Sequence, residues 1–332
     1  MHSYAAGQRS WGAGARDGLT VSFCGPDRCY GVCGDAFSGC QEGYLGVEGI
    51  VGSPSNVYRT NDAGIMWEPT PVNPFIATED VRGLVTFLNT SSTWKVAAAR
   101  GVIDAANPAE IAVSDNRGLT WTNYDVGAVN GQYMIGRGDS VFGFGGTRIW
   151  TVTTGGYIYT SDDGCQTWTA QQSGTLTTSD LYAIHFADNL HGVAVGEDNY
   201  ILATTNAGED WSLITAPAAE VGNTVLGIHM IDNERWWVCY DSARIYYTND
   251  GGTSFRERPL PISGVGSIRR IKFASPYSGW LLHLNAAGTV GTVYHTVNGG
   301  YTWELQAMPT GTGPLYDIWP CDCNTAYFAG EF

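Results

Sequence analysis

The sequence predicts an all-β fold, a single seven-bladed β-propeller of four-stranded antiparallel blades, and three observations support this prediction. An eight-residue frame, hydroxyl-x-Asp/Asn-x-Gly-x-x-aromatic, occurs six times along the 332 residues. A short β-branched or aromatic run precedes each copy, as Tyr157-Ile158-Tyr159 does. The closing aromatics lie 43 residues (168 to 211) to 54 residues (67 to 121) apart. Four-stranded propeller blades have this length, about 40 to 50 residues.

Each frame has the composition of a turn between two strands. The Asp or Asn side chain can accept backbone hydrogen bonds within its own turn, Gly adopts a positive φ without steric cost, and the aromatic buries its ring at the start of the return strand. Cys165 stands where the third copy would have Gly, and Phe255 replaces Trp in the fifth. The predicted structural residues are Asp62, Gly64, Trp67, Asn116, Gly118, Trp121, Asp163, Trp168, Asn206, Gly208, Trp211, Asp250, Gly252, Phe255, Asn298, Gly300 and Trp303.

Three copies carry an amide in place of the carboxylate, at Asn116, Asn206 and Asn298. The amide keeps the hydrogen-bond acceptor and removes the charge. A Ca²⁺ loop would require carboxylate oxygens at several positions, so the frames are predicted to be structural turns, and we expect no metal or other cofactor there.

These frames resemble the Asp-box (BNR) repeat, which occurs in β-propellers such as sialidases, sortilin-type domains and Ycf48-like photosystem assembly factors. The closest resemblance is to Ycf48-like and sortilin-type non-catalytic propellers, as in residues 191–196 followed by residues 201–211. The resemblance implies the propeller fold. It leaves the activity open, because one fold hosts unrelated functions.

A single domain, residues 1–332, is expected. After Trp303 only inner-strand patterns remain, and Ser10-Trp11 has the ending of a frame, so the two chain ends are predicted to share one blade. The alternative is six blades plus a capping segment. In the third blade the inner strand is expected around Tyr133–Ile135. The predicted blades are approximately residues 18–75, 79–130, 131–175, 180–220, 224–262, 265–310, and 312–332 completed by 1–14.

The eight cysteines are unevenly distributed, and six of them crowd the two ends of the predicted ring. Even numbers of cysteines in a non-cytosolic protein indicate disulfides. Free thiols or a zinc site are the alternatives, although the spacing does not match paired CxxC ligands. The candidate disulfide residues are Cys24, Cys29, Cys33, Cys40, Cys321 and Cys323.

The formal net charge of −15 argues against nucleic acid or an anionic membrane as a partner. No apolar run reaches transmembrane length, so membrane insertion is not expected. The first residues show neither a basic nor an apolar segment typical of a signal peptide. An extracellular or virion-associated location is expected from the cysteine pattern alone.

Catalytic candidates are few. A sialidase needs an arginine cluster for the substrate carboxylate, and Arg269 and Arg270 alone do not supply it. A glycosidase needs two converging carboxylates. Asp188 and Asp232 recur at one blade position and are expected to stabilise a repeated turn. Asp317, the third candidate, has no counterpart at an equivalent position. No catalytic residue is therefore assigned.

Two histidines, His185 and His229, occupy equivalent inner-strand positions, and Lys272 occupies the same position in the sixth blade. The two readings are a polar column near the central channel and a metal site completed by a third ligand. The polar column is favoured.

The chain is therefore expected to be a non-catalytic structural or interaction propeller with other protein chains as partners, a component of a larger assembly such as a phage tail or capsid decoration. Two alternatives stay open: a propeller that binds or hydrolyses a glycan, and a Ycf48-like assembly factor.

Overall fold

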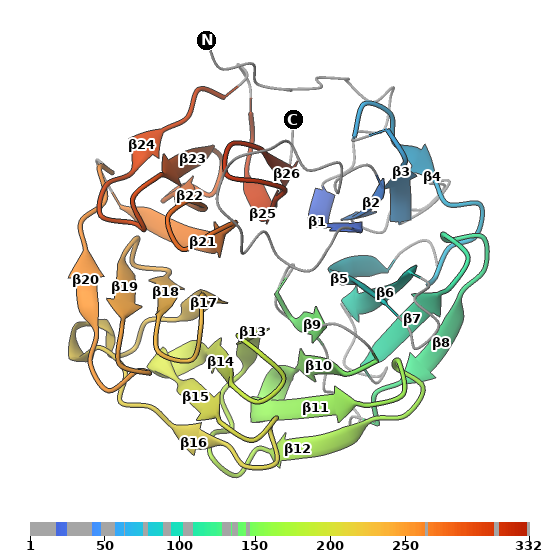
Figure 1. The fold of residues 1–332 in the computed structure, drawn as a ribbon, viewed down its shortest axis with the longest axis horizontal. Coiled ribbons are helices and arrows are strands. Elements are labelled where there is room, and N and C mark those ends of the chain that lie inside the picture. Colours follow the sequence, from blue (N-terminus) through green and yellow to red (C-terminus); the bar gives the residue numbers. More distant parts are fainter. Residues whose placement is uncertain are drawn as a thin grey trace.

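The computed structural model describes residues 18–24 (backbone), 42–47, 57–62, 64–75, 79–88, 94–101, 109–127, 134, 139–143, 147–262, 265–308 and 312–330. These residues form sheets arranged around a central axis, so the fold is an all-β propeller (Figure 1). Within each sheet the strands follow one another in chain order and pair antiparallel.

The described residues contain six four-stranded blades. The first three are β1 (Gly18–Cys24), β2 (Glu42–Val47), β3 (Val57–Thr60) and β4 (Glu68–Pro69); β5 (Asp80–Leu88), β6 (Trp94–Gly101), β7 (Glu110–Ser114) and β8 (Thr122–Asp125); and β9 (Val141–Gly143), β10 (Ile149–Val152), β11 (Tyr157–Ser161) and β12 (Thr169–Ser173). The next three are β13 (Leu181–Phe186), β14 (Gly192–Gly196), β15 (Ile201–Thr204) and β16 (Ser212–Leu213); β17 (Val225–Met230), β18 (Trp236–Tyr240), β19 (Ile245–Thr248) and β20 (Arg256–Arg258); and β21 (Gly266–Phe273), β22 (Gly279–Asn285), β23 (Gly291–Thr296) and β24 (Glu304–Leu305).

Within the described part of the chain, a seventh sheet has two strands, β25 (Leu315–Pro320) and β26 (Ala326–Gly330). It lies between the sixth and first blades (Figure 1), and β25 contacts both β21 and β1. Seven four-stranded blades are thus not confirmed, and the alternative of six blades with an additional segment is closer to the structure. Residues 1–14, which were predicted to complete this sheet, lie outside the described residues.

The hydrophobic core lies between neighbouring blades. One cluster joins Val193 and Val195 of the fourth blade to Trp236 and Val238 of the fifth, and another joins β26 to Leu45 and Trp67 of the first blade. The inner strand β17 is buried along its length, whereas the outermost strands β16 and β24 are exposed. The adjacent Trp236 and Trp237, only 1% and 2% exposed, are core residues.

The inner strands other than β9 share a register shift near their start, for example between Val225 and Gly227 and between Ile268 and Arg270. A bulge of this kind adds one residue and redirects the side chains that follow. The same shift occurs between Leu315 and Asp317. Arg270 and Asp317 therefore occupy the same post-bulge position in neighbouring sheets, and both side chains are buried.

The prediction for the inner strand of the third blade is wrong. That strand is β9, Val141–Gly143, and Tyr133 and Ile135 lie outside the described residues. The apolar-x-apolar pattern is lost here because Gly143 stands where other blades have a large side chain. A Cβ at Gly143 would lie 2.7 Å from Ile149 Cδ1, so the isoleucine from β10 occupies that space.

Candidate functional site

The six frames form one repeated hydrogen-bond pattern. The hydroxyl of the first residue donates to the Asp or Asn Oδ1 at 2.7–3.0 Å and accepts the N–H of the fifth residue at 2.7–3.0 Å. The same Oδ1 accepts the N–H of the seventh residue at 2.9–3.0 Å. Carboxylate and amide serve equally as this acceptor. The chemistry is that of a turn, and none of it requires a bound ion.

The fifth position of the frame has a positive φ even where the residue is not glycine. Cys165 has a φ of 76°, and its side chain is fully buried. Burial also raises the pKa of the Cys165 thiol. A buried thiol of this kind is inert, so the third frame gives no evidence of redox or nucleophilic chemistry.

Frames also contact the preceding blade. A Cβ on Gly300 of the sixth frame would lie 2.4 Å from Trp237, and one on Gly64 of the first frame would lie 3.0 Å from Tyr327 of β26. The carbonyl of Ala207 in the fourth frame accepts hydrogen bonds from Trp150 and Gln171 of the third blade, at 3.3 and 3.2 Å. The frames thus lie at the junctions of the ring.

The carboxylates considered for catalysis have structural partners. Asp188 accepts the N–H groups of Leu190 and His191, at 2.7 and 2.8 Å, and Asp232 holds the equivalent turn in the next blade. Burial raises the pKa of Asp188, but these hydrogen bonds outweigh it and keep the pKa below its usual value. Both residues therefore resemble turn caps and not a pair of catalytic acids.

Around the channel axis, four charged side chains from three sheets converge. Asp139, just before β9, pairs with Lys272 of β21, and its other oxygen lies 3.5 Å from Arg270 Nε. Asp317 of β25 lies 3.6 Å from the same Arg270 Nε. Arg270 also donates to the carbonyl of Leu226, at 3.1 Å. Two cations and two carboxylates thus balance each other in a mostly buried site.

His185 and His229 lie beside this cluster, with ring centroids 4.6 Å apart. Phe142 of β9 continues the row, 4.7 Å from His185, and the N–H of Met230 donates to His185 Nδ1 at 3.2 Å. The arrangement is that of a polar and aromatic column between blades. Among the described residues, no group of three His, Cys, Asp or Glu side chains is placed to hold a metal ion.

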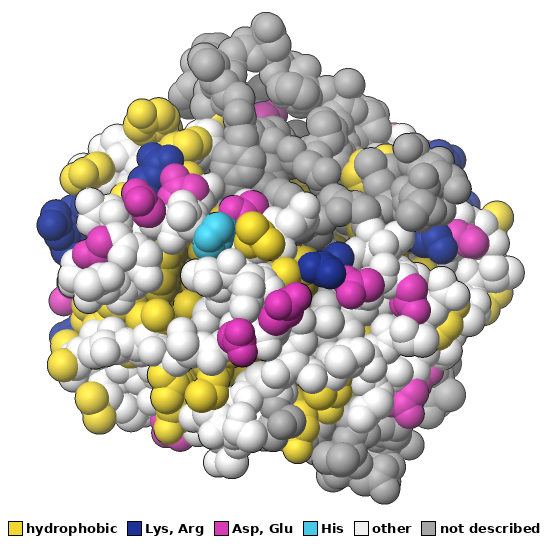
Figure 2. Space-filling view, turned by 60° about the horizontal axis from the view of Figure 1, so that its bottom comes forward, with side chains coloured by type: hydrophobic (Ala, Val, Ile, Leu, Met, Phe, Trp, Pro, Cys, Tyr) yellow, Lys and Arg dark blue, Asp and Glu magenta, His cyan; other side chains and the backbone are white. Residues whose placement is uncertain are grey.

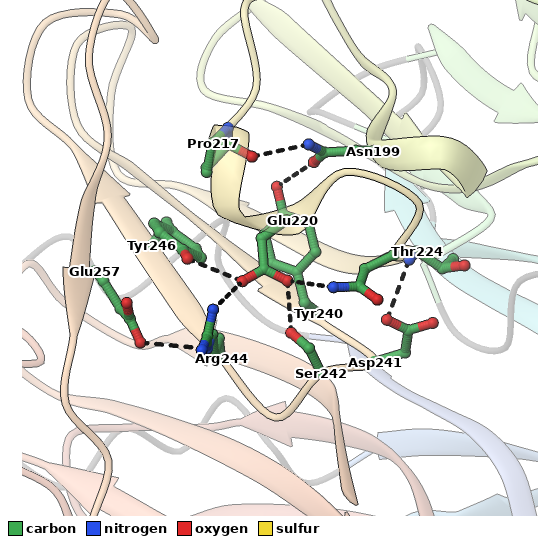
Figure 3. A network of polar contacts seen from close by, with 11 residues as sticks. Asn199, Pro217, Glu220, Thr224, Tyr240, Asp241, Ser242, Arg244, Tyr246 and Glu257 are labelled. Carbon is green, nitrogen blue, oxygen red and sulfur yellow. Dashed lines mark hydrogen bonds and ion pairs between the residues drawn. The ribbon is translucent and has the colours of Figure 1, made fainter.

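A second polar network lies between the fourth and fifth blades (Figure 3). Glu220 is fully buried and accepts hydrogen bonds from Ser242 Oγ at 2.6 Å, Tyr246 OH at 2.8 Å, Asn223 Nδ2 at 2.8 Å and Arg244 Nη1 at 3.2 Å. Burial raises the pKa of Glu220, but these donors outweigh it and the pKa is lowered. The carboxylate therefore stays charged and fixes the β18–β19 turn.

Beside this network lies a depression of about 280 Å³. Its lining includes Arg244, whose Nε is 3.6 Å from Glu257. Arg244 already pairs with Glu220 and Glu257, so this arginine offers no uncompensated charge to a ligand in the depression.

The face that carries the frames contains an unusual surface cluster. Arg258 lies over the ring of Tyr301, 4.3 Å from its centroid, and 5.4 Å from that of Tyr247. Tyr277 adjoins the sixth frame, since its carbonyl accepts the N–H of Gly299 at 2.8 Å. We call Arg258, Tyr247, Tyr277, Val297 and Tyr301 the Tyr–Arg cluster. Three of its side chains are largely exposed: Tyr277 (69%), Val297 (68%) and Tyr301 (63%).

Elsewhere charge is dispersed. Figure 2 shows a face on which acidic and basic side chains of the described residues lie in small groups between uncharged ones. Seven of the seventeen basic residues nevertheless fall within residues 235–272: Arg235, Arg244, Arg256, Arg258, Arg269, Arg270 and Lys272. Within the described part of the chain, no helix has the length and apolarity needed to cross a bilayer.

Of the six candidate disulfide residues, only Cys321 and Cys323 have side chains among the described residues. The side chains of Cys24, Cys29, Cys33 and Cys40 lie outside the described residues, so the pairing of the six cysteines stays a prediction. The backbone of β1, which ends at Cys24, contacts β25, which ends beside Cys321. Cys165 and Cys239 are free and buried.

Comparison with known proteins defines the class. A family model described as photosynthesis system II assembly factor YCF48 matches residues 175–319. The photosystem II stability/assembly factor HCF136, chloroplastic, of Oryza sativa subsp. japonica is 26% identical over 148 residues. That match covers 44% of this chain and 34% of the rice protein, about a third of the relative's length.

Solved structures agree on the fold. A structure of YCF48 bound to a D1 peptide has a TM-score of 0.66 at 15% identity and covers 96% of this chain and 91% of its own. YCF48 from Cyanidioschyzon merolae gives 0.66 at 16%, with coverages of 96% and 94%. The GH74 xyloglucanase from Xanthomonas campestris gives 0.70 at 13%, covering 96% of this chain and 51% of the enzyme. At these identities the structural matches establish the fold alone.

The chain is thus a BNR-type β-propeller. Within that class, residues 175–319 are similar to the Ycf48 assembly factors, as the family-model match and the rice relative indicate. These findings favour the assembly-factor alternative of the sequence analysis over its main hypothesis, a phage or virion component, which gains no support from them.

Proposed function

We propose that this chain is a non-catalytic assembly factor that binds a segment of a partner protein. The observation that carries the proposal is the YCF48 family-model match over residues 175–319, which takes in the fourth, fifth and sixth blades. A Ycf48 structure bound to a D1 peptide provides the precedent for a peptide ligand on this fold.

The arrangement of charged groups agrees with a binding role. The carboxylates at Asp188 and Asp232 are engaged by turn N–H groups, and Asp317 is buried beside Arg270. A glycosidase would need two carboxyl groups free to reach one glycosidic bond. A protein-binding propeller needs instead a rigid ring that presents surface side chains, and the frames and the inter-blade core supply that rigidity.

The test is a peptide array carrying the termini and soluble segments of membrane-complex subunits from the source organism, with the D1 peptide as a first probe. The proposal predicts that a small set of segments binds the purified chain with a salt-dependent Kd. Absence of binding to every segment would overturn it, and release of sugars from xyloglucan or aryl glycosides would then favour the glycan alternative. An extracellular location also remains a proposal, and it is tested by fractionating the source cells.

A further inference from the structure

The repeats of the propeller provide an internal reference for its surface. The second position of the frame is polar in five copies, at Asn61, Asp115, Asp162, Thr205 and Asn249, and apolar in the sixth, at Val297. The sixth position holds Gln166, Glu209 and Thr253 in the third, fourth and fifth frames, and the aliphatic Ile65 and Leu119 in the first and second. In the sixth frame it holds Tyr301. The fold does not require these apolar side chains, because the same turn forms without them.

The turn next to the sixth frame carries a further exposed aromatic residue. The turn between β17 and β18 carries Glu234 at the position where the turn between β21 and β22 carries Tyr277. Because Gly279 pairs with Thr296, the β21–β22 turn and the sixth frame lie at the same end of their blade. Tyr277, Val297 and Tyr301 are therefore exposed on one side of the sixth blade, and exposed apolar groups gathered in this way mark interaction sites.

Arg258 gives this surface its charge. No carboxylate among the described residues lies within ion-pair distance of it, whereas the adjacent Glu257 pairs with Arg244. Its guanidinium lies over Tyr301 and Tyr247, at 4.3 and 5.4 Å from the ring centroids, an arrangement that holds it in place. Tyrosine and arginine are also the residues most enriched in binding hot spots.

From these contacts we infer that the Tyr–Arg cluster is the docking surface for an extended peptide segment that carries a carboxylate next to an apolar residue. The carboxylate pairs with Arg258, an unneutralised cation in a chain of net charge −15, and the apolar residue packs on Tyr277, Val297 and Tyr301. This inference rests on the proposed protein-binding function and names the partner chemistry and the surface.

The experiment measures fluorescence anisotropy of labelled twelve-residue peptides with the full chain. One probe alternates Asp and Leu, a matched probe replaces Asp by Asn, and xyloglucan oligosaccharide serves as the competitor for the glycan alternative. The inference predicts that the Asp probe binds at least tenfold more tightly than the Asn probe, and that its affinity falls as salt rises, since surface charge pairs are screened.

Variants locate the site. Arg258→Gln and Tyr301→Ala should each weaken binding of the Asp probe about tenfold. The first removes a charge-assisted contact with the peptide, and the second removes an aromatic ring that the bound peptide covers. Two matched controls should bind as the wild type does. Leu119→Ala changes the same frame position in the second blade, and Arg148→Gln changes an arginine that lies over Trp150 but pairs with Asp162.

The outcomes are distinct. Equal affinity of the wild type and both cluster variants for the Asp probe would overturn the docking site, as would displacement only by oligosaccharide. If array segments bind the wild type and the cluster variants equally, the site is wrong and the proposed function stands. If neither probes nor array segments bind, both are wrong.

Discussion

The frames are expected to stabilise the ring through their contacts with the preceding blade, and Gly300→Ala tests this directly. Gly300 has a φ of +78°, and a Cβ there would lie 2.4 Å from Trp237, a side chain only 2% exposed. A non-glycine residue in the left-handed region costs about 1–2 kcal/mol. Forcing extra volume into a packed core costs about 1–3 kcal/mol more. The free energy of unfolding should therefore fall by about 2–5 kcal/mol.

Gly288→Ala is the matched control. Gly288 lies in the β22–β23 hairpin of the same blade and has a φ of +70°. A Cβ added there would have no heavy atom within 4 Å. The free energy of unfolding of Gly288→Ala should fall only by the cost of a non-glycine residue in the left-handed region, about 1–2 kcal/mol. Urea unfolding followed by far-ultraviolet circular dichroism measures both variants. If the two variants lose the same stability, the contact with Trp237 contributes nothing and the argument that frames join blades is refuted.

Three further predictions follow from the charged groups. Asp139→Asn should lower the free energy of unfolding by about 3–5 kcal/mol, because it leaves Lys272 without its carboxylate partner and Arg270 with Asp317 alone; a loss below 1 kcal/mol in urea unfolding would show that the cluster is solvated. Glu220→Gln should cost about 1–3 kcal/mol through weakened bonds to Ser242, Tyr246 and Arg244, and a double-mutant cycle with Arg244→Gln should show coupling, the absence of which would contradict it. Hydrogen bonds from Ser254 and Thr248 lower the pKa of Asp250 to about 2, so its contribution to stability is present above about pH 4, the ordinary range of the carboxyl, and is lost as the pH falls towards 2. Asp250→Asn should remove that part of the pH dependence and leave stability at pH 7 nearly unchanged, as the Asn frames imply; an unchanged acid profile in urea midpoints would exclude this role.

Much of the ring was predictable because each frame is a local structure. The hydroxyl, the Asp or Asn acceptor and the positive-φ position lie within five residues, so their spacing is visible in the chain. Trp236 and Trp237 were predictable as core for a similar reason, since strands packed between blades are buried on both faces.

Other features depend on contacts between distant residues. The pairing of Asp139 with Lys272 joins positions 133 residues apart and arises only when the ring closes. The shared bulge that places Arg270 and Asp317 in equivalent positions becomes visible only once each inner strand is paired with its neighbour. The inner strand of the third blade was misplaced because Ile149, from the neighbouring strand, fills the space above Gly143.

Part of the Tyr–Arg cluster could have been predicted from the sequence by comparing the six frames with one another. Frame-by-frame comparison singles out Val297 as apolar where the other five copies are polar, and Tyr301 as the aromatic residue at its frame position. Arg258, which comes from the preceding blade, could not be joined to them until the structure brought β20 beside the sixth frame.

Hydrogen–deuterium exchange with and without the Asp–Leu peptide tests the binding account most directly, because it reports the contacted surface without any substitution. The account predicts slower exchange in the turn around Tyr277 and in residues 297–302, with other frames unchanged. Slower exchange confined to another blade, for example to the second frame, residues 114–121, would contradict it.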